Sequence, residues 1–456
     1  MAKNKIGQSF FFENPPGIIE VSTIVGSEES KGPFAKYFDI TAQDSKFAQE
    51  TWEKAEKEMI KKCINHVLNK SSIAKKDIDL MIGGDLLNQI TTSNYTARDF
   101  SLPFLGIYGA CSSMIEGLII GAMIMDGGFA DCILAFSSSH YQTAERQYRT
   151  PLEYGDQYPP YKQWTVTGGG AYILGWLNAK VKITQATIGK IVDKGIKDAN
   201  NMGGAMAAAA ADTIIQHLKD SSQSVKDYDL IITGDLGKDG RKTLLALLKE
   251  KNINFPKKFF DCGAEIFKND KKYGAGGSGC AASATLLGAY FIPALMRGDY
   301  KKILAIGTGA LLSPITVMQG ESIPGIAHAI TLERNWGVSL GNYLTAFLIG
   351  GLICVIGQII LDNTKYTPAH LLVGLVVTAS ILTGLGYYEK LIKFAGAGVT
   401  VPVANFGHIL TKGVLEAMEN DGFLALFKGV LAKASAGVSG SVIIAFTIAL
   451  IFNTKK

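Results

Sequence analysis

The stretch GVSLGNYLTAFLIGGLICVIGQIIL (residues 337–361) decides the architecture of this chain, because it runs for 25 residues without a charged side chain. A helix rises about 1.5 Å per residue, so about 20 apolar residues cross the roughly 30 Å hydrocarbon core of a bilayer. Two further uncharged stretches follow, of 23 residues at 366–388 and 20 residues at 434–453. The sequence therefore predicts an all-α transmembrane domain of three or four helices, which we place at 332–456.

The count of helices depends on the segment FAGAGVTVPVANFGHILT (394–411), which is apolar but interrupted by glycines and a proline. Irregular backbone is tolerated at membrane depth only inside protein or beside water. One interpretation is a broken or re-entrant segment that lines a pore, with Asn405 and His408 as its polar members. The other is a surface-lying or loosely packed helix, and the sequence leaves both open.

The residues before 331 have the pattern of a soluble α/β protein that contains an internal repeat. DIDLMIGGDL (77–86) and DYDLIITGDL (227–236) each follow a helix-like stretch and have the pattern of a short buried strand that ends at a Gly-Asp turn. GACSS (109–113) and GCAAS (279–283) each open an apolar helical pattern that leads to another strand.

Two copies of such a unit predict a duplicated, layered α/β domain in which helices cover two mixed sheets. We place the N-terminal half at 1–180 and the C-terminal half at 181–331. The remaining alternative is a chance likeness between two ordinary α/β units.

Composition excludes several classes of function. The formal net charge of the 456 residues is +5 and the lysines are scattered, so nucleic acid is not an expected partner. The N-terminus has no apolar core of a secretory signal. The six cysteines show no C-x-x-C spacing, which predicts reduced thiols on the cytosolic side rather than a zinc site or disulfides. No cofactor or metal is expected, and no loop has calcium-ligand spacing.

The segment IYGACSSMIEG (107–117) places Cys111 at a glycine-flanked turn from a strand into a helix. The positive end of a helix dipole favours thiolate, which is how a nucleophilic cysteine is built. A small residue that packs at a tight turn is the alternative.

These residues resemble known families. YGACSS (108–113) resembles the nucleophile elbow of the thiolase and β-ketoacyl synthase superfamily, and GGGAYILG (168–175) resembles its glycine-rich strand. A narrower resemblance, to the stage V sporulation protein AD family, covers nearly all of 1–331. It rests on GDLLNQ (84–89), SSSH (137–140), AERQYR (144–149), QWTVTGGG (163–170), AAADTI (209–214), AGGSGC (275–280), TGALLSP (308–314) and ESIPGIAH (321–328).

The tail also resembles a family. GLICVIGQ (351–358) and KFAGAGVTVPVANFGH (393–408) are similar to the stage V sporulation protein AE family, a small membrane component of the same spore system. The chain therefore resembles a fusion of two proteins, which fixes a one-to-one ratio and a high effective concentration. The resemblance implies a multi-pass protein of the spore inner or forespore membrane with a large soluble N-terminal domain. It also implies other spore channel subunits as partners, and a homodimer through the thiolase-like domain.

A thiolase-type catalyst needs a base, oxyanion donors and a group that handles the substrate proton. In the superfamily these are largely His, Asn or a second Cys on loops of the C-terminal half. The corresponding loop YGAGGSGCAAS (273–283) has neither His nor Asn, and GTGALLS (307–313) has neither Cys nor His. We therefore expect a binding pocket with no catalytic residues. Cys280 is expected either near Cys111 by pseudo-symmetry or as a packing residue.

The resemblance implies dipicolinate, pyridine-2,6-dicarboxylate, as the ligand, with or without calcium. A planar dianion is bound by guanidinium groups, helix N-terminal N–H groups and aromatic walls. The candidate ligand-binding residues are Cys111, Ser112, Ser113, His140, Arg146, Arg149, Thr165 and Thr167.

Alternatives remain for several of these residues. The two arginines lie beside Tyr148 and Tyr154, and they can equally belong to a surface ion-pair network. Asp85 is expected as a turn or helix cap, or as a partner of bound calcium. His66 and His217 fall in helix patterns that predict solvated side chains.

The function that the resemblance implies is a dipicolinate-binding or calcium dipicolinate-binding subunit of a spore membrane channel. It would act in dipicolinate uptake during sporulation and release in germination. A membrane-tethered structural scaffold of the channel is one alternative. An active acyltransferase of the thiolase or ketoacyl synthase type, tethered to the bilayer, is the other.

Overall fold

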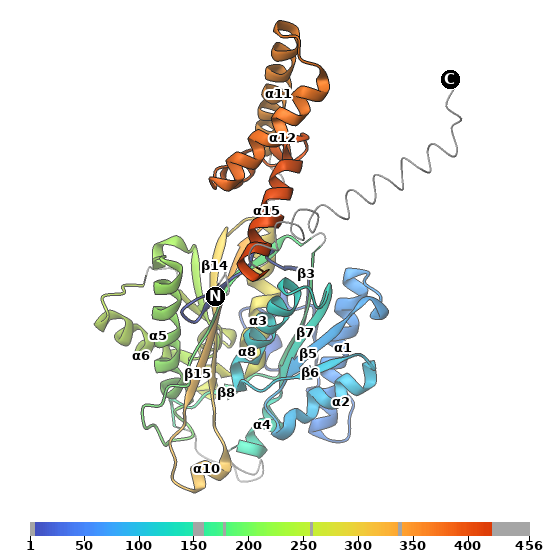
Figure 1. Cartoon of the computed structure of the whole chain (residues 1–456). Coiled ribbons are helices and arrows are strands. Elements are labelled where there is room, and N and C mark those ends of the chain that lie inside the picture. Colours follow the sequence, from blue (N-terminus) through green and yellow to red (C-terminus); the bar gives the residue numbers. More distant parts are fainter. Residues whose placement is uncertain (1–4, 149–158, 177–178, 256–258, 336–339, 422–456) are drawn as a thin grey trace. The chain divides into compact units, whose positions relative to one another are not determined.

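The computed structural model divides into two compact units, Met1–Asn335 and Trp336–Lys456 (Figure 1). It describes residues 5–148, 159–176, 179–255, 259–335 and 340–421.

Five strands of the N-terminal half follow one another along the main path of a single large sheet. These five strands are named in their order in the sheet, from a central strand to an outer edge. The first two pairs of neighbouring strands are antiparallel, and the last two pairs are parallel. In that order the strands are β3 (Gly17–Val25), β9 (Gly168–Gly175), β7 (Cys132–Ser139), β5 (Leu80–Gly84) and β6 (Phe104–Gly106).

The C-terminal half repeats this arrangement with the same sequence of strand directions. Its strands are β10 (Val181–Ile188), β15 (Gly325–Arg334), β14 (Lys302–Ala310), β11 (Leu230–Thr233) and β12 (Phe259–Asp261). The halves join where β10 pairs with β3, through Val181 opposite Ile18. The repeated sequences around 80 and 230 occupy equivalent positions, as β5 and β11, and the predicted duplication is confirmed.

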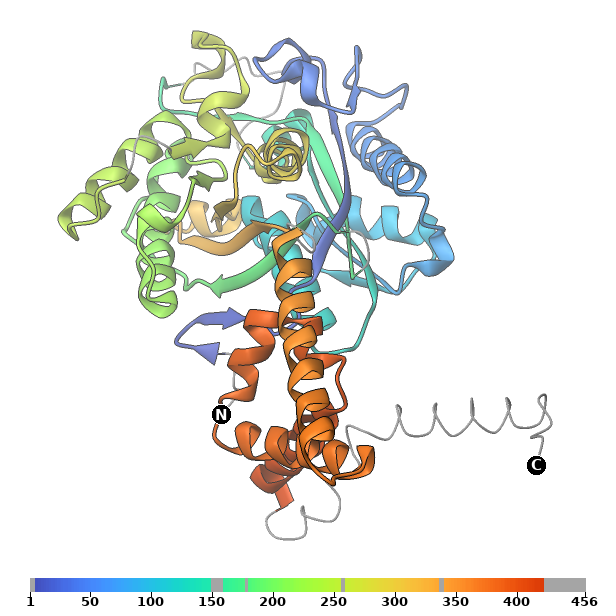
Figure 2. The ribbon, with the colours of Figure 1, turned by 90° about the horizontal axis from the view of Figure 1, so that it is seen from above.

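Helices form the layers around and between these strands. The central helices α3 (Ser113–Asp126) and α8 (Cys280–Leu286) contact strands of the sheet, and α3 touches strands of both halves. On the outside, α1 (Trp52–Ser71) covers β3 and β9, whereas α5 (Met202–Ser221) covers β14 and β15. Figure 2 shows the blue α1 side and the green α5 side flanking the strands.

Glycines permit the close approach of the central helices. A Cβ on Gly170 of β9 would come within 2.8 Å of the carbonyl oxygen of Ala284 in α8. A Cβ on Gly307 of β14 would come within 2.8 Å of the Cβ of Ile115 in α3. The glycine-rich strand therefore serves packing, because protein interiors leave no spare volume for an added carbon.

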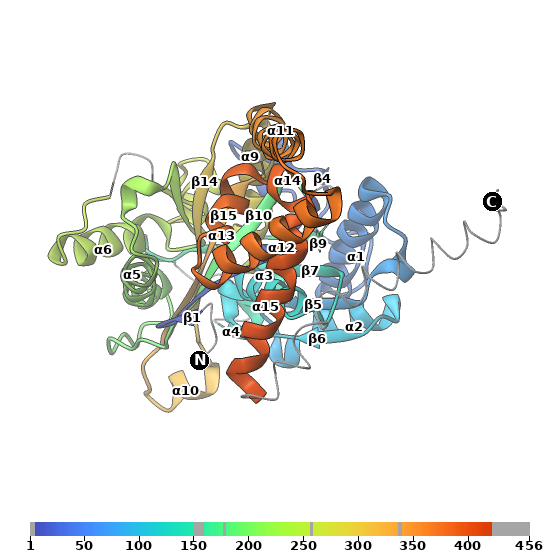
Figure 3. The ribbon, with the colours of Figure 1, turned by 45° about the horizontal axis from the view of Figure 1, so that its top comes forward.

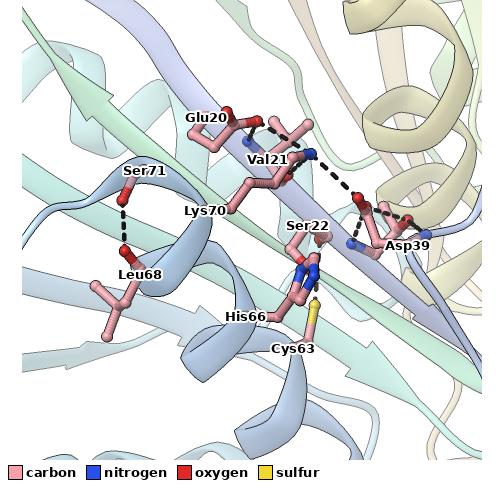
Figure 4. A network of polar contacts seen from close by, with 10 residues as sticks. Glu20, Val21, Ser22, Asp39, Cys63, His66, Leu68, Lys70 and Ser71 are labelled. Atoms are coloured by element: carbon pink, nitrogen blue, oxygen red, sulfur yellow. Dashed lines mark hydrogen bonds and ion pairs between the residues drawn. The ribbon is translucent and has the colours of Figure 1, made fainter.

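A polar network fastens α1 to β3 (Figure 4). The Cys63 thiol donates to the Ser22 carbonyl at 3.2 Å, and the Nδ1 atom of His66 is 2.9 Å from the Ser22 hydroxyl. Lys70 donates to the Val21 carbonyl at 3.0 Å and pairs with Asp39 at 3.1 Å. The expectation of a solvated His66 is met only in part, because the half-buried ring also bonds to the strand beneath the helix.

The second unit is helical over the described residues (Figure 3). The first predicted span corresponds to α11, of which Tyr343–Asn363 is long and apolar enough to cross a membrane. The second corresponds to the shorter apolar helix α12, and the third, 434–453, lies outside the described residues. The helices are α11 (Leu340–Asn363), α12 (Pro368–Gly384), α13 (Tyr388–Ala395), α14 (Ala397–Thr400) and α15 (Ala404–Asp421). Cys280–Arg297 in the first unit passes the same test of length and composition but is mostly buried there.

The glycine-interrupted segment is broken into three helices, as one of the two interpretations expects. Gly396, at φ +49°, separates α13 from α14. His408 on α15 is buried, and its Nδ1 is 2.9 Å from the Thr383 hydroxyl while its ring stacks on Tyr388 at 4.9 Å. Buried polar groups in an apolar helical unit are satisfied by one another in this way.

We expect Gly407→Leu to destabilise the second unit. A Cβ at Gly407 would collide with the backbone carbonyl of Val376 on α12, so α15 would have to move away. Overpacking of this kind costs about 1–3 kcal/mol or more. Thermal unfolding of the full chain in detergent, followed by circular dichroism, would measure it. Gly374→Leu is the matched control, because a Cβ at Gly374 meets nothing within 4 Å, and an equal loss in both variants would contradict the prediction.

Candidate functional site

The turn that carries Cys111 has the strained geometry of a nucleophile elbow. The chain leaves β6, passes through a short helical turn at Ala110–Ser112 and enters α3. Ala110 has φ +49°, in the left-handed region that residues other than glycine rarely adopt. Such strain persists where the surrounding structure imposes it, and it is common at functional sites. Cys111 thus stands at the start of α3, as the sequence predicts.

A cavity of about 30 Å³ lies over Cys111, and we call it the elbow pocket. Its lining is apolar apart from hydroxyl groups and the thiol, and none of the described lining residues is His, Lys or Arg. Thr165 is in this wall, as predicted. The lining residues are Leu86, Tyr108, Ala110, Cys111, Ala144, Tyr148, Thr165, Met202, Ser278, Ala310 and Leu312.

The surroundings of Cys111 favour the neutral form of its thiol. Burial raises its pKa well above the ordinary value, and the neighbouring Asp235 and Cys280 raise it further. Asp235 is itself buried, and it accepts hydrogen bonds from the Gly279 N–H and the Thr308 hydroxyl, both at 2.8 Å. Burial raises the pKa of Asp235 to about 7. The expectation that the helix terminus favours thiolate is therefore not met, because burial and a nearby acid outweigh the dipole.

Cys280 lies in the same apolar cluster as Cys111, together with Leu86 and Ala144. Its thiol donates to the carbonyl oxygen of Ala110 at 3.3 Å. The equivalent starts of α3 and α8 thus bring the two cysteines together, as the repeat predicts.

Three further predicted ligand residues, Ser112, Ser113 and Thr167, have hydroxyls that bond to backbone groups. Ser112 donates to the Gly109 carbonyl and Ser113 to the Ala110 carbonyl, both at 2.7 Å, so both hydroxyls fix the turn. The Thr167 hydroxyl accepts the Tyr141 N–H at 3.0 Å. None of the three is among the described residues of the elbow pocket, and these expectations are corrected accordingly.

His140 does not reach the elbow pocket. Its Nε2–H donates to the Ser45 carbonyl at 2.8 Å, and its ring lies 5.6 Å from that of Trp52. Burial lowers its pKa to about 4. The expected ligand role of His140 is corrected, because the imidazole is fixed to the loop at Ser45 and is not among the described lining residues of the elbow pocket.

His217 is also buried rather than solvated. Its Nδ1 is 2.7 Å from the Thr187 hydroxyl and its Nε2 is 2.8 Å from the Tyr228 hydroxyl. Burial lowers the pKa of His217 to about 4. Both partners come from other elements, so the ring ties α5 to the sheet.

The arginine predictions have different outcomes. Arg146 on α4 (Tyr141–Tyr148) forms an ion pair with Glu53, is half exposed and does not line the elbow pocket. The surface ion-pair alternative therefore describes it, and its expected ligand role is corrected. Arg149 and Tyr154 lie outside the described residues.

Asp85 has the capping role that the sequence allows. It is buried, and its carboxylate accepts the Leu87 N–H at 2.8 Å and the Ser93 N–H at 2.7 Å. Among the described residues, no group of three or more His, Cys, Asp or Glu side chains could hold a metal ion.

A larger groove adjoins the elbow pocket, and few features of the sequence indicate it. It holds about 390 Å³ and shares Tyr108, Tyr148 and Leu312 with the elbow pocket. The two tyrosine hydroxyls are 2.9 Å apart, and Tyr148 also donates to the Leu86 carbonyl. The only sequence signal for the pair is that each tyrosine stands inside a family motif.

The wall of this groove contains strained backbone. Gln89 and Ile90 both have positive φ, at 53° and 46°, and Ile90 is β-branched, for which this conformation is a clear outlier. Asn88 and Gln89 provide amide groups to the same wall.

Comparison with known proteins agrees with the two-unit architecture. Residues 7–333 match the family described as stage V sporulation protein AD, and residues 342–451 match the family described as SpoVAC/SpoVAEB sporulation membrane protein. Stage V sporulation protein AD of Bacillus subtilis (strain 168) is 44% identical over 332 residues, which cover 73% of this chain and 98% of that protein. Stage V sporulation protein AC of the same organism is 30% identical over 118 residues, or 24% of this chain and 79% of that protein.

Solved structures with a similar fold are enzymes. 3-oxoacyl-[acyl-carrier-protein] synthase III from Aquifex aeolicus VF5 is 16% identical, with 70% of this chain and 99% of that chain covered and a TM-score of 0.44. Human mitochondrial 3-ketoacyl-CoA thiolase in complex with CoA is 13% identical, with 71% and 98% covered and a TM-score of 0.44. These likenesses concern the fold and say nothing about activity.

The match to the stage V sporulation protein AD family covers almost the whole first unit. The second unit likewise belongs to a family of sporulation membrane proteins. The chain therefore belongs to the stage V sporulation protein AD family and carries, in the same polypeptide, a membrane unit of the SpoVAC/SpoVAEB family.

Proposed function

We propose that this chain is the dipicolinate-binding subunit of a spore membrane channel, acting in dipicolinate uptake during sporulation and release in germination. The observation that carries the proposal is the elbow pocket. It keeps the strained Cys111 turn of an acyl-transfer enzyme, yet it holds the thiol neutral beside Asp235. A site of this kind binds a ligand without reacting with it.

The described surroundings of Cys111 support binding over catalysis. A neutral thiol is a poor nucleophile, and a general base must lie within hydrogen-bond reach of the proton that it removes. His140 is fixed to Ser45 instead, and the carboxyl beside the thiol, Asp235, already accepts the Gly279 N–H and the Thr308 hydroxyl. We therefore propose that the protein is not an enzyme.

We propose that the ligand binds in the groove beside the elbow pocket. Tyr108 and Tyr148 provide an aromatic wall, and Asn88 and Gln89 provide amides that can bond to carboxylate oxygens. None of the described residues of the groove is charged, so a neutral calcium chelate suits it better than a free dianion. Arg149 follows Tyr148 directly in the chain, and we propose it as the cation that pairs with a carboxylate.

The membrane unit supports a channel component rather than a free binding protein. The family of that unit is described as a sporulation membrane protein, so we propose the spore inner or forespore membrane as the location and other channel subunits as partners. A homodimer through the thiolase-like unit is part of the proposal. The edge strand β6 supports it, because Leu105 there is exposed and, within the described residues, the strand pairs only with β5.

Calorimetric titration of the full chain in detergent with dipicolinate, with and without calcium, tests the function. We expect saturable binding that Arg149→Gln weakens about tenfold, since a charge-assisted hydrogen bond contributes roughly 1.5–3 kcal/mol. Cys111→Leu, which fills the elbow pocket, should weaken it as well. Arg146→Gln is the matched control, because Arg146 pairs with Glu53 outside both cavities, and its affinity should stay within about twofold of the unchanged chain.

Other results of this titration would support one of the two alternative functions. No dipicolinate heat with any calcium concentration would leave the scaffold alternative and overturn the proposal. Acetyl-CoA binding, or acylation of Cys111 detected by mass spectrometry, would favour the acyltransferase alternative.

A further inference from the structure

The chain leaves the first unit at one end of the strands of its large sheet. Asn335 follows the last residue of β15, and its N–H donates to the Lys180 carbonyl at 2.7 Å. The register continues from there across five strands, which lie about 4.8 Å apart. From β7 to β15 the pairs are Cys132–Gly175, Gly175–Gly17, Gly17–Lys182 and Lys182–Glu333. The turn at 127–131 before β7, Trp176 after β9 and Asn335 after β15 therefore share one edge of the unit, which we call the exit edge.

The sequence becomes apolar just beyond the exit edge. The helix α11 begins at Leu340, five residues after Asn335, and it contains a stretch long and apolar enough to cross a membrane. An extended chain gains at most about 3.6 Å per residue, so no more than roughly 18 Å separates the Cα atoms of these two residues. This limit follows from chain length alone. The exit edge is thus the part of the first unit that the covalent chain keeps near a bilayer.

Two large aromatic side chains are exposed on the exit edge. Phe129 is 85% exposed, the largest fraction for a large apolar side chain among the described residues. It follows Gly128, which has φ +76° and nothing within 4 Å of an added Cβ, so the turn stands clear of its surroundings. Trp176 is 37% exposed, and its Nε1–H donates to the Asp131 carboxylate at 3.1 Å. An exposed phenyl ring near an indole with a bonded N–H is typical of side chains at a membrane–water interface.

The charges of the exit edge do not favour an anionic surface. Around the two rings the carboxylates of Glu13, Asp79, Asp126 and Asp131 outnumber the exposed Lys180. Nearer to Asn335 the two signs nearly balance, with Arg297, Lys301, Lys302 and Arg334 beside Asp229, Asp299 and Glu333. A contact between this edge and lipid therefore has to be apolar, because no basic surplus attracts the headgroups.

We propose that the exit edge of the first unit contacts the bilayer surface, with the Phe129 ring inserted among the lipid headgroups and acyl-chain ends and the Trp176 indole at headgroup level. The short connection to α11 supplies a high effective concentration, so one inserted ring suffices without long-range attraction. The contact restricts rotation of the first unit about its connection. It also leaves the elbow pocket away from the bilayer, because the pocket includes Ala310 at the end of β14, and that strand begins at Lys302 on the exit edge.

Quenching of tryptophan fluorescence by lipid tests this contact. The full chain is reconstituted in phosphatidylcholine vesicles whose acyl chains carry bromine near the headgroup, and unbrominated vesicles are the reference. Every variant carries Trp336→Phe, because that residue adjoins the predicted span. We expect bromine to quench part of the remaining fluorescence, and Trp176→Phe to remove that part. Trp52 and Trp164 should not be quenched, because they lie near the opposite ends of the strands, beside His140 and just before β9.

A pair of matched variants tests the inserted ring. Phe129→Ser should lower the ratio of membrane-bound to detached first unit about tenfold, with a corresponding loss of Trp176 quenching, because an apolar side chain no longer leaves water. Met318→Ser is the control, since Met318 is 80% exposed on α10 (Pro314–Met318), which follows the far end of β14. High salt should not change the quenching, because the contact does not depend on charge.

Three results would overturn the proposal. The first is the absence of lipid quenching of Trp176, and the second is equal quenching in Phe129→Ser and Met318→Ser. In the third, iodide in the water fails to reach Trp176 although lipid bromine does not quench it, and a second copy of the chain then covers the exit edge. Bromine near the ends of the acyl chains should quench Trp176 less than bromine near the headgroup. This comparison needs no variant at Phe129, so it keeps the test decisive if Phe129→Ser does not fold.

Discussion

Replacing Asp261 with leucine should unfold the thiolase-like unit. Asp261 ends β12 and is fully buried, and its carboxylate accepts four hydrogen bonds. The donors are the N–H groups of Leu236, Gly237 and Ala264, at 2.8–3.0 Å, and the hydroxyl of Thr233 at 2.7 Å. A buried donor without a partner costs about 1–3 kcal/mol, so three orphaned N–H groups cost roughly 3–9 kcal/mol, which approaches the whole stability of a domain.

The same substitution should disturb the elbow pocket. The two N–H groups that Asp261 holds at Leu236 and Gly237 follow directly after Asp235, the acid that lies beside Cys111. A loop that loses both bonds no longer fixes the Asp235 carboxylate against Gly279 and Thr308. Any Asp261→Leu protein that does fold should therefore also bind dipicolinate more weakly.

Denaturant unfolding of the full chain, followed by tryptophan fluorescence, would measure the loss of stability. Asp261→Asn should lie between the leucine variant and the unchanged chain, because its amide oxygen still accepts part of the network while its NH₂ group cannot. Asp299→Leu is the control for the added apolar side chain, since Asp299 is exposed and pairs only with Arg297 among the described residues. An unfolding midpoint for Asp261→Leu equal to that of Asp299→Leu would contradict the argument.

The fold was predictable because its signals are local and repeated. The patterns at 77–86 and 227–236 became β5 and β11, in equivalent positions of the two halves. The cysteine turn at 109–113 was predictable for the same reason, since glycines on both sides of a strand-to-helix junction leave few other conformations.

The chemistry of the site depended on contacts that the local sequence does not contain. The helix terminus at Cys111 predicts a lowered pKa of the thiol. Burial of the thiol, and then Asp235 from the other half of the unit, raise that pKa instead. The position of His217 in α5 predicts a surface residue. In the structure, its ring nitrogens bond to Thr187 and Tyr228, which belong to other parts of the sequence. His140 follows the last residue of a strand, where one position decides which face the side chain takes.

The second large effect concerns pH, and it follows from two buried glutamates. We expect the thiolase-like unit to lose roughly 4 kcal/mol of stability between pH 6.5 and 8.5. Each of the two buried glutamates lowers the free energy of unfolding by about 1.36 kcal/mol per pH unit, over about 1.5 pH units of this range. Burial raises the pKa of Glu29 to about 8. Burial, with the charge of Asp85 nearby, raises that of Glu56 to about 8. Both glutamates would ionise at about 4.5 in the unfolded chain.

The direction follows from which state holds the protons. A folded-state pKa above the unfolded value means that the stabilisation is fully present below pH 4.5 and is lost as the pH rises through 8. The buried histidines act oppositely. Burial lowers the pKa of His140, His217 and His328 from 6.5 to about 4, so their contribution is lost as the pH falls from 6.5 to 4. Above pH 6.5 they are neutral in both states. The slope there belongs mainly to Glu29 and Glu56, with additions from other carboxyls whose pKa burial raises, namely Asp235, Asp85 and Glu116.

Urea unfolding of the full chain at pH 6.5, 7.5 and 8.5 would measure this slope. Glu56→Gln removes one of the two titrations while keeping the side chain's shape beside Ser138 and Thr143, whose hydroxyls now donate to it. We therefore expect its slope to fall by about half, and that of Glu29→Gln/Glu56→Gln to be nearly flat. Glu250→Gln, at an exposed position, should keep the full slope. Stability that is constant or rising from pH 6.5 to 8.5 in the unchanged chain would mean that both carboxyls are ionised in the folded unit. The hydroxyl and N–H groups around them would then have to stabilise the charge more strongly than burial opposes it.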